Sequence, residues 1–232
     1  MARQHRIQSI ARRAWRVLRT QGLRGVWIKL LDVSLHRRLL VLECPVDDAR
    51  SFQRAGLDGS VIHGFLTRAG IDDYVAFRLS EEDDLNPVAS SAPKSLREHL
   101  ERRLDAGCVC ATALIDGRIV VGVWAGVGGG EVDYLRCSVR LDPQAVYLHD
   151  VYTRPSQRGL GLAPGLIGGM AEHFQAAGCR RLVALVLSEN AASLRSLGRV
   201  GFRRVGVAGY WGFGRLRCLF CTAPGCSLVS LP

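Results

Sequence analysis

The stretch YLHDVYTRPSQRGLGLA, residues Tyr147 to Ala163, carries the strongest structural signal in this chain. The apolar, β-branched and aromatic run from Ala145 to Thr153 predicts a strand that stops before Pro155. A short turn of small residues follows, and apolar side chains then recur at helical spacing from Leu162 to Phe174. The stretch therefore predicts a strand, a small-residue turn and an amphipathic helix, in that order.

The start of the predicted helix suits an anion. The first backbone N–H groups of a helix have no internal acceptor, and they lie at the positive end of its dipole. Gly159, Gly161 and Ala163 leave room for an anionic oxygen, and Arg158 can add a charge-assisted bond. The alternative is a tight turn that needs glycine only for its backbone angles. The pattern allows a phosphate or pyrophosphate site without requiring one.

Two sequence blocks resemble the GNAT superfamily of acyl-CoA N-acyltransferases. Residues Arg158 to Ala163 fit the R/Q-x-x-G-x-G/A signature of that family, and Pro155 stands just before them. Asn190 and the pair Gly201-Phe202 resemble the second block, an asparagine followed by a helix that ends in G-F. Two blocks in the same order and spacing are much more specific than either alone.

The resemblance implies an α/β (α+β) fold with a mixed, mostly antiparallel twisted sheet. A central parallel pair of strands would splay around the donor site, and helices would flank the sheet. The residues support the parallel pair, because the apolar run Arg181 to Leu187 follows the strand and helix described above, which implies a right-handed crossover. The resemblance is clear from Cys108 to Leu219, weaker from Pro45 to Gly107 and absent from Met1 to Glu43.

The remaining elements follow from apolar runs and turn residues. Asp116-Gly117 between two apolar runs is a hairpin signal. The glycine run 126–130 is expected to be a flexible turn, since no helix follows it. Strands are expected at 38–44, 59–67, 108–115, 119–125, 204–207 and 216–221, and helices at 72–79, 95–106 (capped by Ser95) and 191–200.

Charge divides the chain into segments. The 232 residues, 48% hydrophobic, suffice for one domain with an appendage. Of the net charge of +10, +9 belongs to residues 1–42, where ten basic side chains face a single acid, Asp32. The sequence therefore predicts a basic amphipathic helical extension at 1–42, a GNAT-like acyltransferase domain at 43–221 and a disordered tail at 222–232.

The extension at 1–42 is compatible with three roles. Its apolar face, with Trp15 and Trp27, can pack on the parent domain, lie on an anionic membrane surface or dock on an acidic partner. An acidic acyl carrier protein would be such a partner and would replace CoA as acyl donor. Nucleic acid is an unlikely partner in this pattern, because no recognised motif or aromatic platform accompanies the charge.

The sequence also predicts a location and the state of the cysteines. No apolar run reaches the roughly 18 to 20 residues of a membrane span, and the charged start lacks the core of a secretory signal. A cytoplasmic protein is expected, with peripheral membrane contact left open. Cys218-x-x-Cys221, with Cys226 beyond, is an incomplete zinc set, so reduced thiols and no metal are expected.

The resemblance also implies how acetyl-CoA, or another acyl-CoA, would bind as co-substrate. The backbone of Val151 and Thr153 would bond the pantetheine arm, and the Val151 N–H would stabilise the developing oxyanion. Asn190 would lie near the pantetheine or order the adjacent helix. The pyrophosphate would be held by the N–H groups of Arg158, Gly159, Leu160, Gly161, Leu162 and Ala163.

A general base is expected on or beside the strand that precedes the turn. The candidates are His149, Asp150 and Tyr152, the first two equally favoured. Strict alternation puts His149 and Val151 on one face and Asp150 and Tyr152 on the other, unless a bulge intervenes. A purely structural hydrogen bond in the sheet is the alternative role of His149 or Asp150.

These features predict an N-acyltransferase that moves an acyl group, in the simplest case acetyl, from acyl-CoA to a primary amine by direct attack in a ternary complex. Leu197 replaces the tyrosine that many family members use as general acid. Two alternatives stay open: a long-chain or carrier-bound acyl donor, and a non-catalytic CoA-binding or membrane-associated scaffold of the same fold. Hydrolase and nucleotidase motifs are missing, and no residue pattern indicates which amine accepts the acyl group.

Overall fold

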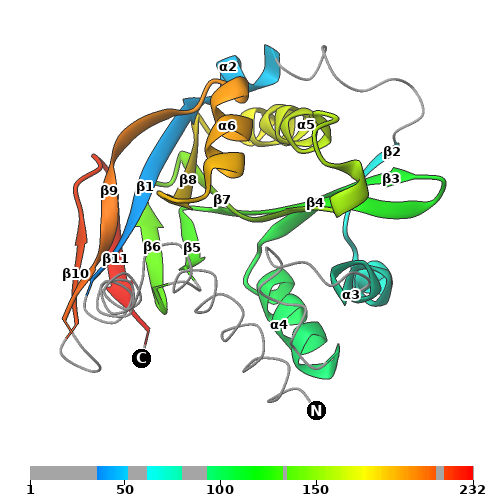
Figure 1. The fold of residues 1–232 in the computed structure, drawn as a ribbon, viewed down its shortest axis with the longest axis horizontal. Coiled ribbons are helices and arrows are strands. Elements are labelled where there is room, and N and C mark those ends of the chain that lie inside the picture. The colour runs from blue at the N-terminus through cyan, green and yellow to red at the C-terminus, as the bar shows by residue number, and fades with distance from the viewer. Residues whose placement is uncertain (1–35, 52–61, 80–92, 133–134, 213–216, 232) are drawn as a thin grey trace, which may run out of the picture.

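The computed structural model describes residues 36–51, 62–79, 93–132, 135–212 and 217–231 (Figure 1). Most of the predicted helical extension falls on residues 1–35 and so lies outside the described residues. The charge pattern extended that helical segment to residue 42, whereas the apolar run predicted a strand at 38–44; the strand is confirmed, since these residues lie in β1 (His36–Pro45). Arg37 and Arg38 are basic, but pairing with residues 181–187 on one side and 203–211 on the other makes this segment a central strand of the sheet. Leu39 and Val41 are buried in one apolar cluster, and Leu42 and Cys44 are buried in another.

One sheet of eight strands forms the centre of the molecule (Figure 1). Every neighbouring pair is antiparallel except β7 with β8, so the predicted mostly antiparallel sheet with one parallel pair is confirmed. Its strand order is β10 (Cys218–Cys221), β9 (Arg203–Trp211), β1, β8 (Arg181–Leu187), β7 (Ala145–Thr153), β4 (Arg118–Val127), β3 (Val109–Ile115) and β2 (Ile62–Phe65).

Helices cover both faces of this sheet, as Figure 1 shows. On one face lie α2 (Val46–Ser51), α5 (Leu162–Ala176) and α6 (Ala191–Val200). On the other lie α3 (Ile71–Leu79), α4 (Pro93–Asp105) and a second sheet, whose order is β11 (Cys226–Ser230), β6 (Cys137–Leu141) and β5 (Gly129–Val132).

The paired halves of the two central strands, from Ala145 to Leu148 and from Leu182 to Leu185, are apolar because both of their faces are buried. Val146 and Leu148 of β7 pack in the cluster that includes α5. Tyr147 of β7 and Val183 of β8 pack on the opposite face, in the cluster that includes the second sheet. A third cluster joins α3 and α4 to Trp124 of β4. The sheet thus separates an α5 side from an α3/α4 side.

The predicted disorder of residues 222–232 is wrong. Cys226–Ser230 forms β11 and pairs antiparallel with β6, from Cys226 opposite Leu141 to Ser230 opposite Cys137. Cys226 and Leu228 pack against the buried cluster beneath the main sheet. This pairing joins residues about 85 positions apart, so a local reading of a short, moderately apolar segment could not find it.

Two local predictions also need correction. The glycine run 126–130 is a tight connection between β4 and β5, in which Gly128 and Gly129 have φ of 73° and 133°. A Cβ at Gly129 would collide with the Val139 carbonyl, so glycine is needed for the close approach of β5 to β6. Ser95 does not cap its helix, because α4 begins at Pro93, a residue suited to the first helical turn.

Gly122 of β4 provides a test of the packing between the sheet and α3. A Cβ at this position would lie 2.5 Å from the Tyr74 hydroxyl oxygen, and that hydroxyl accepts a 3.0 Å bond from Trp124 Nε1. We expect Gly122→Ala to lower the free energy of unfolding by about 1–3 kcal/mol through overpacking, measured by urea denaturation. Gly64→Ala in β2 is the control, since nothing lies within 4 Å of its added Cβ. Equal effects of the two substitutions would contradict this packing.

Candidate active site

The parallel strands separate in the middle of the sheet. Pairing of β7 with β8 begins at Ala145–Arg181 and ends at Leu148–Ala184. Beyond that point β7 pairs only with β4, as far as Thr153, while β8 continues beside β1 as far as Leu187. The carboxyl halves of the two strands therefore have no shared ladder, and such points in parallel sheets are common ligand sites.

A bulge interrupts β7 where the two strands separate. Trp124 pairs with His149 and Gly122 with Tyr152, so Asp150 and Val151 together lie opposite a single residue of β4. Asp150 has a φ of 47°, in the left-handed region that glycine usually occupies in bulges of this kind. Neither Asp150 nor Val151 has a ladder partner in β4 or β8.

The bulge changes which side chains share a face. Strict alternation predicted Asp150 and Tyr152 opposite His149, and this is wrong. The His149 ring stacks on Tyr147 at 5.2 Å, and both Asp150 and Tyr152 contact α3 on the same side of the sheet. The extra residue of the bulge shifts the alternation by one position. All three candidate bases therefore face α3 and α4.

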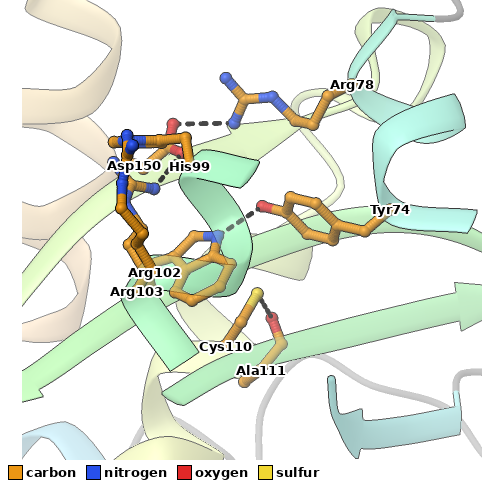
Figure 2. Close-up of polar contacts among 9 residues, drawn as sticks. Tyr74, Arg78, His99, Arg102, Arg103, Cys110, Ala111 and Asp150 are labelled. Carbon is orange, nitrogen blue, oxygen red and sulfur yellow. Dashed lines mark hydrogen bonds and ion pairs between the residues drawn. The ribbon is translucent and has the colours of Figure 1, made fainter. Parts of the chain in front are cut away.

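Two buried arginines hold the Asp150 carboxylate (Figure 2). Arg78 Nη1 of α3 lies 2.8 Å from Asp150 Oδ1, and Arg103 Nη1 of α4 lies 2.8 Å from Oδ2. The two arginine side chains are only 1% and 6% exposed. Their guanidinium carbons lie over aromatic rings, Arg78 over Tyr152 at 4.4 Å and Arg103 over Trp124 at 5.3 Å.

These contacts make the Asp150 carboxylate a weak base. Burial alone would raise the pKa of its carboxyl, but the positive charges of Arg78 and Arg103 outweigh burial and hold that pKa well below its usual range. A carboxylate with such a low pKa accepts a proton from an amine poorly. Both of its oxygens are also already bonded to arginine. Asp150 is therefore an ionised, fixed group at neutral pH.

His149 stays neutral for a different reason. Burial of its ring and the nearby positive charge of Arg103 lower its pKa from 6.5 to about 3, and the charge of Asp150 opposes them only in part. His99 of α4 also lowers the pKa of His149 through its charge. Among the described residues no group bonds the buried His149 Nε2. The ring therefore offers a neutral imidazole beside the bulge.

Tyr152 is buried and packs its ring edge-on to Phe77 at 5.3 Å, beneath the Arg78 guanidinium. These contacts give it a packing role in the arginine cluster. Val151, by contrast, is 41% exposed. Of the four predicted catalytic residues, the structure thus brings His149, Asp150 and Tyr152 together on one side of the sheet and leaves Val151 accessible at the bulge.

The turn after β7 has the geometry of an anion site. Gly161 caps α5 with a φ of 77°, and Gly159 has a φ of 85°. In the described part of the chain, the N–H groups from Gly159 to Ala163 donate to no acceptor. A Cβ added at Gly159 or Gly161 would meet nothing within 4 Å, so the space above the turn is open. Leu160, between these glycines, is also exposed.

Arg158 differs from the other residues of the predicted pyrophosphate loop. Its backbone N–H donates to the Pro155 carbonyl at 3.3 Å, so that donor is already used. Its side chain Nε donates to the Thr153 carbonyl at 3.2 Å and links the turn to the end of β7. The N–H groups of the described turn that remain available to an anion are therefore those of Gly159, Leu160, Gly161, Leu162 and Ala163.

Asn190 is the N-cap of α6. Its side-chain oxygen accepts from the Ser193 N–H at 3.1 Å, and its backbone carbonyl accepts from Leu194. Of the two roles left open for this residue, ordering the adjacent helix is the one observed. The helix it starts ends at Gly201, whose φ is 105°.

Sequence reasoning missed the arginine pair. Arg78 and Arg103 lie in amphipathic helical segments where a charged residue is normally solvated, and no local pattern distinguishes them from their neighbours. The sequence also did not indicate the role of Tyr74, whose hydroxyl accepts a hydrogen bond from Trp124 in the same cluster (Figure 2). Only the packing of α3 and α4 against the bulged strand brings these side chains to Asp150.

A family comparison identifies this arrangement. The model of the acetyltransferase (GNAT) family matches residues 75–202, which is more than half of the chain. This chain belongs to the GNAT acetyltransferase family. Membership places it among the acyl-CoA-dependent N-acyltransferases and agrees with the splayed parallel pair and the open helix N-terminus. No curated protein is similar enough in sequence to match the chain.

Solved structures support the fold. A conserved protein of unknown function from Staphylococcus epidermidis superposes with a TM-score of 0.54 at 10% identity, covering 78% of this chain and 64% of that one. The aminoglycoside N-acetyltransferase AAC(6')-Iy, in complex with CoA, gives a TM-score of 0.50 at 19% identity, covering 62% and 88%. A Drosophila protein gives 0.51 at 11% identity, covering 85% and 57%. At these identities the likeness concerns the fold.

None of the helices in the described ranges combines the length and apolar character of a membrane span. Within the same ranges, no three His, Cys, Asp or Glu side chains come together as metal ligands. All eight cysteines are free thiols.

The low pKa of His149 predicts how stability depends on pH. The unfolded chain takes up a proton near pH 6.5 and the folded chain only near pH 3, so stability falls as pH drops through this window. Between pH 7 and pH 5 the loss due to His149 should be about 2 kcal/mol. His149→Gln should remove that part of the pH dependence, as measured by urea denaturation at both pH values. His173→Gln, at an exposed position of α5, is a suitable comparison variant, and parallel pH profiles for wild type and His149→Gln would contradict the neutral buried ring.

Proposed function

We propose that this protein transfers an acetyl group from acetyl-CoA to a primary amine by direct attack of the amine on the thioester. The observation that carries the proposal is the turn from Gly159 to Ala163, whose open N–H groups lie at the end of the strand that separates from β8. This combination matches what an acyl-CoA needs: an anion site for the pyrophosphate and a gap between strands for the pantetheine arm. A co-substrate with those parts is the best fit to the site.

The donor would be held mainly by backbone. The five N–H groups of the turn would bond the pyrophosphate oxygens, and the positive end of the α5 dipole adds to the attraction. Val151, accessible and outside both ladders, would offer its backbone to the pantetheine arm and acyl group. The Thr153 carbonyl already accepts a hydrogen bond from Arg158. The Thr153 backbone therefore has less hydrogen-bonding capacity left for the donor than the family resemblance implied.

Chemistry on the acyl group needs an oxyanion donor and a route for the amine proton. The Val151 N–H is our candidate donor, because a fixed dipole aimed at developing negative charge lowers the barrier. His149 is the better of the two favoured bases, since none of the described residues bonds its Nε2, whereas both Asp150 oxygens are engaged. With a pKa of about 3, His149 would orient a neutral amine by a hydrogen bond more than it would store the proton.

The leaving thiolate needs little help from this chain. Leu197, at the position of the family's tyrosine acid, is buried in the α5-side cluster and cannot donate a proton. A thiol titrates near 8.5, so CoA can leave as the thiolate. The proton that the attacking amine loses would pass to this thiolate, directly or through water, to give the free thiol of CoA and the amide. We therefore propose that catalysis depends chiefly on positioning and on the oxyanion donor.

Gly161→Glu tests the donor site. The substitution places bulk and negative charge among the turn N–H groups, at a residue with a φ of 77°. We expect binding of acetyl-CoA, measured by calorimetric titration, to weaken roughly tenfold or more, because like charge at a helix start is repulsive and the space is filled.

Ala176→Glu is the matched control, since it adds the same charge at the exposed far end of α5. It should bind acetyl-CoA as the wild type does. Binding by the wild type that is lost only in Gly161→Glu would justify a screen of amine acceptors. Failure of the wild type to bind acetyl-CoA would overturn the proposed donor.

The basic segment 1–42 supports a second proposal for the donor, a long-chain acyl group on an acidic carrier protein. Its charge of +9 would attract such a carrier or an anionic membrane surface. The discriminating measurement compares acetyl-CoA with an acylated carrier protein as donor, at low and high salt. Salt-sensitive turnover with the carrier and none with acetyl-CoA would favour this second donor, and equal absence of turnover on an amine panel would favour a scaffold.

A further inference from the structure

We infer that Asp150 is a positioning residue: gripped by Arg78 and Arg103, it holds the left-handed bulge that sets the direction of the Val151 N–H. This inference rests on the proposed acetyl transfer and assigns Asp150 a role other than proton transfer. Three observations carry it: the backbone angle of Asp150, the two ion pairs, and the place of Val151 directly after it.

The backbone angle is unfavourable for this residue type. Side chains with a Cβ rarely adopt a φ near 47°, and bulges with a left-handed residue usually have glycine there. Asp is one of the few residues that tolerates the conformation, because its short side chain can be held by polar partners. Glycine would adopt this conformation without strain. The presence of Asp in its place indicates that the carboxylate side chain itself is needed at this position.

The two ion pairs fix that side chain from two directions. Arg78 comes from α3 and Arg103 from α4, and each gives a 2.8 Å bond to a different carboxylate oxygen (Figure 2). The guanidinium groups are themselves packed on Tyr152 and Trp124. Since the carboxylate is tied to two helices, the Asp150 backbone cannot rotate without breaking at least one buried, charge-assisted bond.

The peptide that joins Asp150 to Val151 carries the Val151 N–H. Its orientation is set by the backbone angles of Asp150 and lies outside the ladders with β4 and β8. A small rotation at Asp150 therefore moves this N–H while leaving the rest of the sheet in place. Because oxyanion stabilisation depends steeply on donor placement, such a rotation would lower the rate of acyl transfer.

Three substitutions of Asp150 separate positioning from base catalysis. Asp150→Asn keeps tolerance of the left-handed angle and part of the hydrogen bonding, Asp150→Gly keeps only the angle, and Asp150→Ala keeps neither. We expect kcat to fall in that order, with Asp150→Ala lowest by about tenfold to hundredfold. Acetyl-CoA affinity and KM should stay within about twofold, and the shape of the pH–rate profile should not change.

Asp116 supplies the matched control. It also has a left-handed backbone, with a φ of 51°, but lies in the hairpin between β3 and β4. Asp116→Ala and Asp116→Gly should differ in thermal stability and leave kcat unchanged. Arg103→Lys is the milder second variant, in case Asp150→Ala fails to fold. It keeps the charge and loses the guanidinium geometry, so it should lower kcat several-fold without changing the pH profile.

A second measurement keeps the two proposals distinguishable. In ¹⁵N-labelled protein the Val151 amide resonance should move in Asp150→Ala and return towards the wild-type position in Asp150→Gly. If the wild-type protein acetylates no amine, the proposed function is wrong. The Val151 amide resonance would still show whether Asp150 controls the conformation of the bulge. Equal kcat losses in Asp150→Gly and Asp150→Ala with a lost pH limb would make Asp150 the base and overturn the inference. An unmoved Val151 resonance in every variant would overturn it as well.

Discussion

The end of the parallel ladder at Leu148–Ala184 is the constraint on which the functional features of this molecule depend. Hydrogen bonding along β7 and β8 leaves no room for a ligand, so a site between them exists only where the ladder stops. β7 remains in the sheet beyond that point because β4 continues beside it, and β8 remains because β1 does. The gap is therefore held open by two antiparallel neighbours on its outer sides.

The bulge and the helix N-terminus both follow from where β7 goes after the gap opens. The extra residue at Asp150 and Val151 turns three polar or aromatic side chains toward α3 and α4. The strand then ends at Thr153, and the glycine turn presents its free N–H groups at the start of α5. β7 thus connects the N–H groups of the glycine turn to a buried arginine cluster.

In that cluster, buried charged groups hold one another in fixed positions. Two buried guanidinium groups and one carboxylate are costly to desolvate, and their mutual attraction and aromatic contacts offset that cost. Arg103, one of the two arginines that keep Asp150 ionised, also adds to the effect of burial in keeping His149 neutral, so one of the two adjacent side chains is charged and the other is not. Neighbouring groups with divergent pKa values are typical of functional sites.

The sequence by itself determined the order of strand, turn and helix around Arg158–Ala163, the parallel pair and the family. These are local signals: glycine at left-handed positions, apolar runs of strand length, and helical periodicity. It could not determine toward which face of the sheet Asp150 and Tyr152 point, or which side chains form ion pairs with Asp150. Nor could it determine the pairing of Cys226–Ser230 with β6. Those features depend on contacts between residues tens of positions apart, and a single inserted residue in β7 reverses an alternation that sequence alone must assume is regular. Only the tertiary structure therefore decided which polar groups meet at the site.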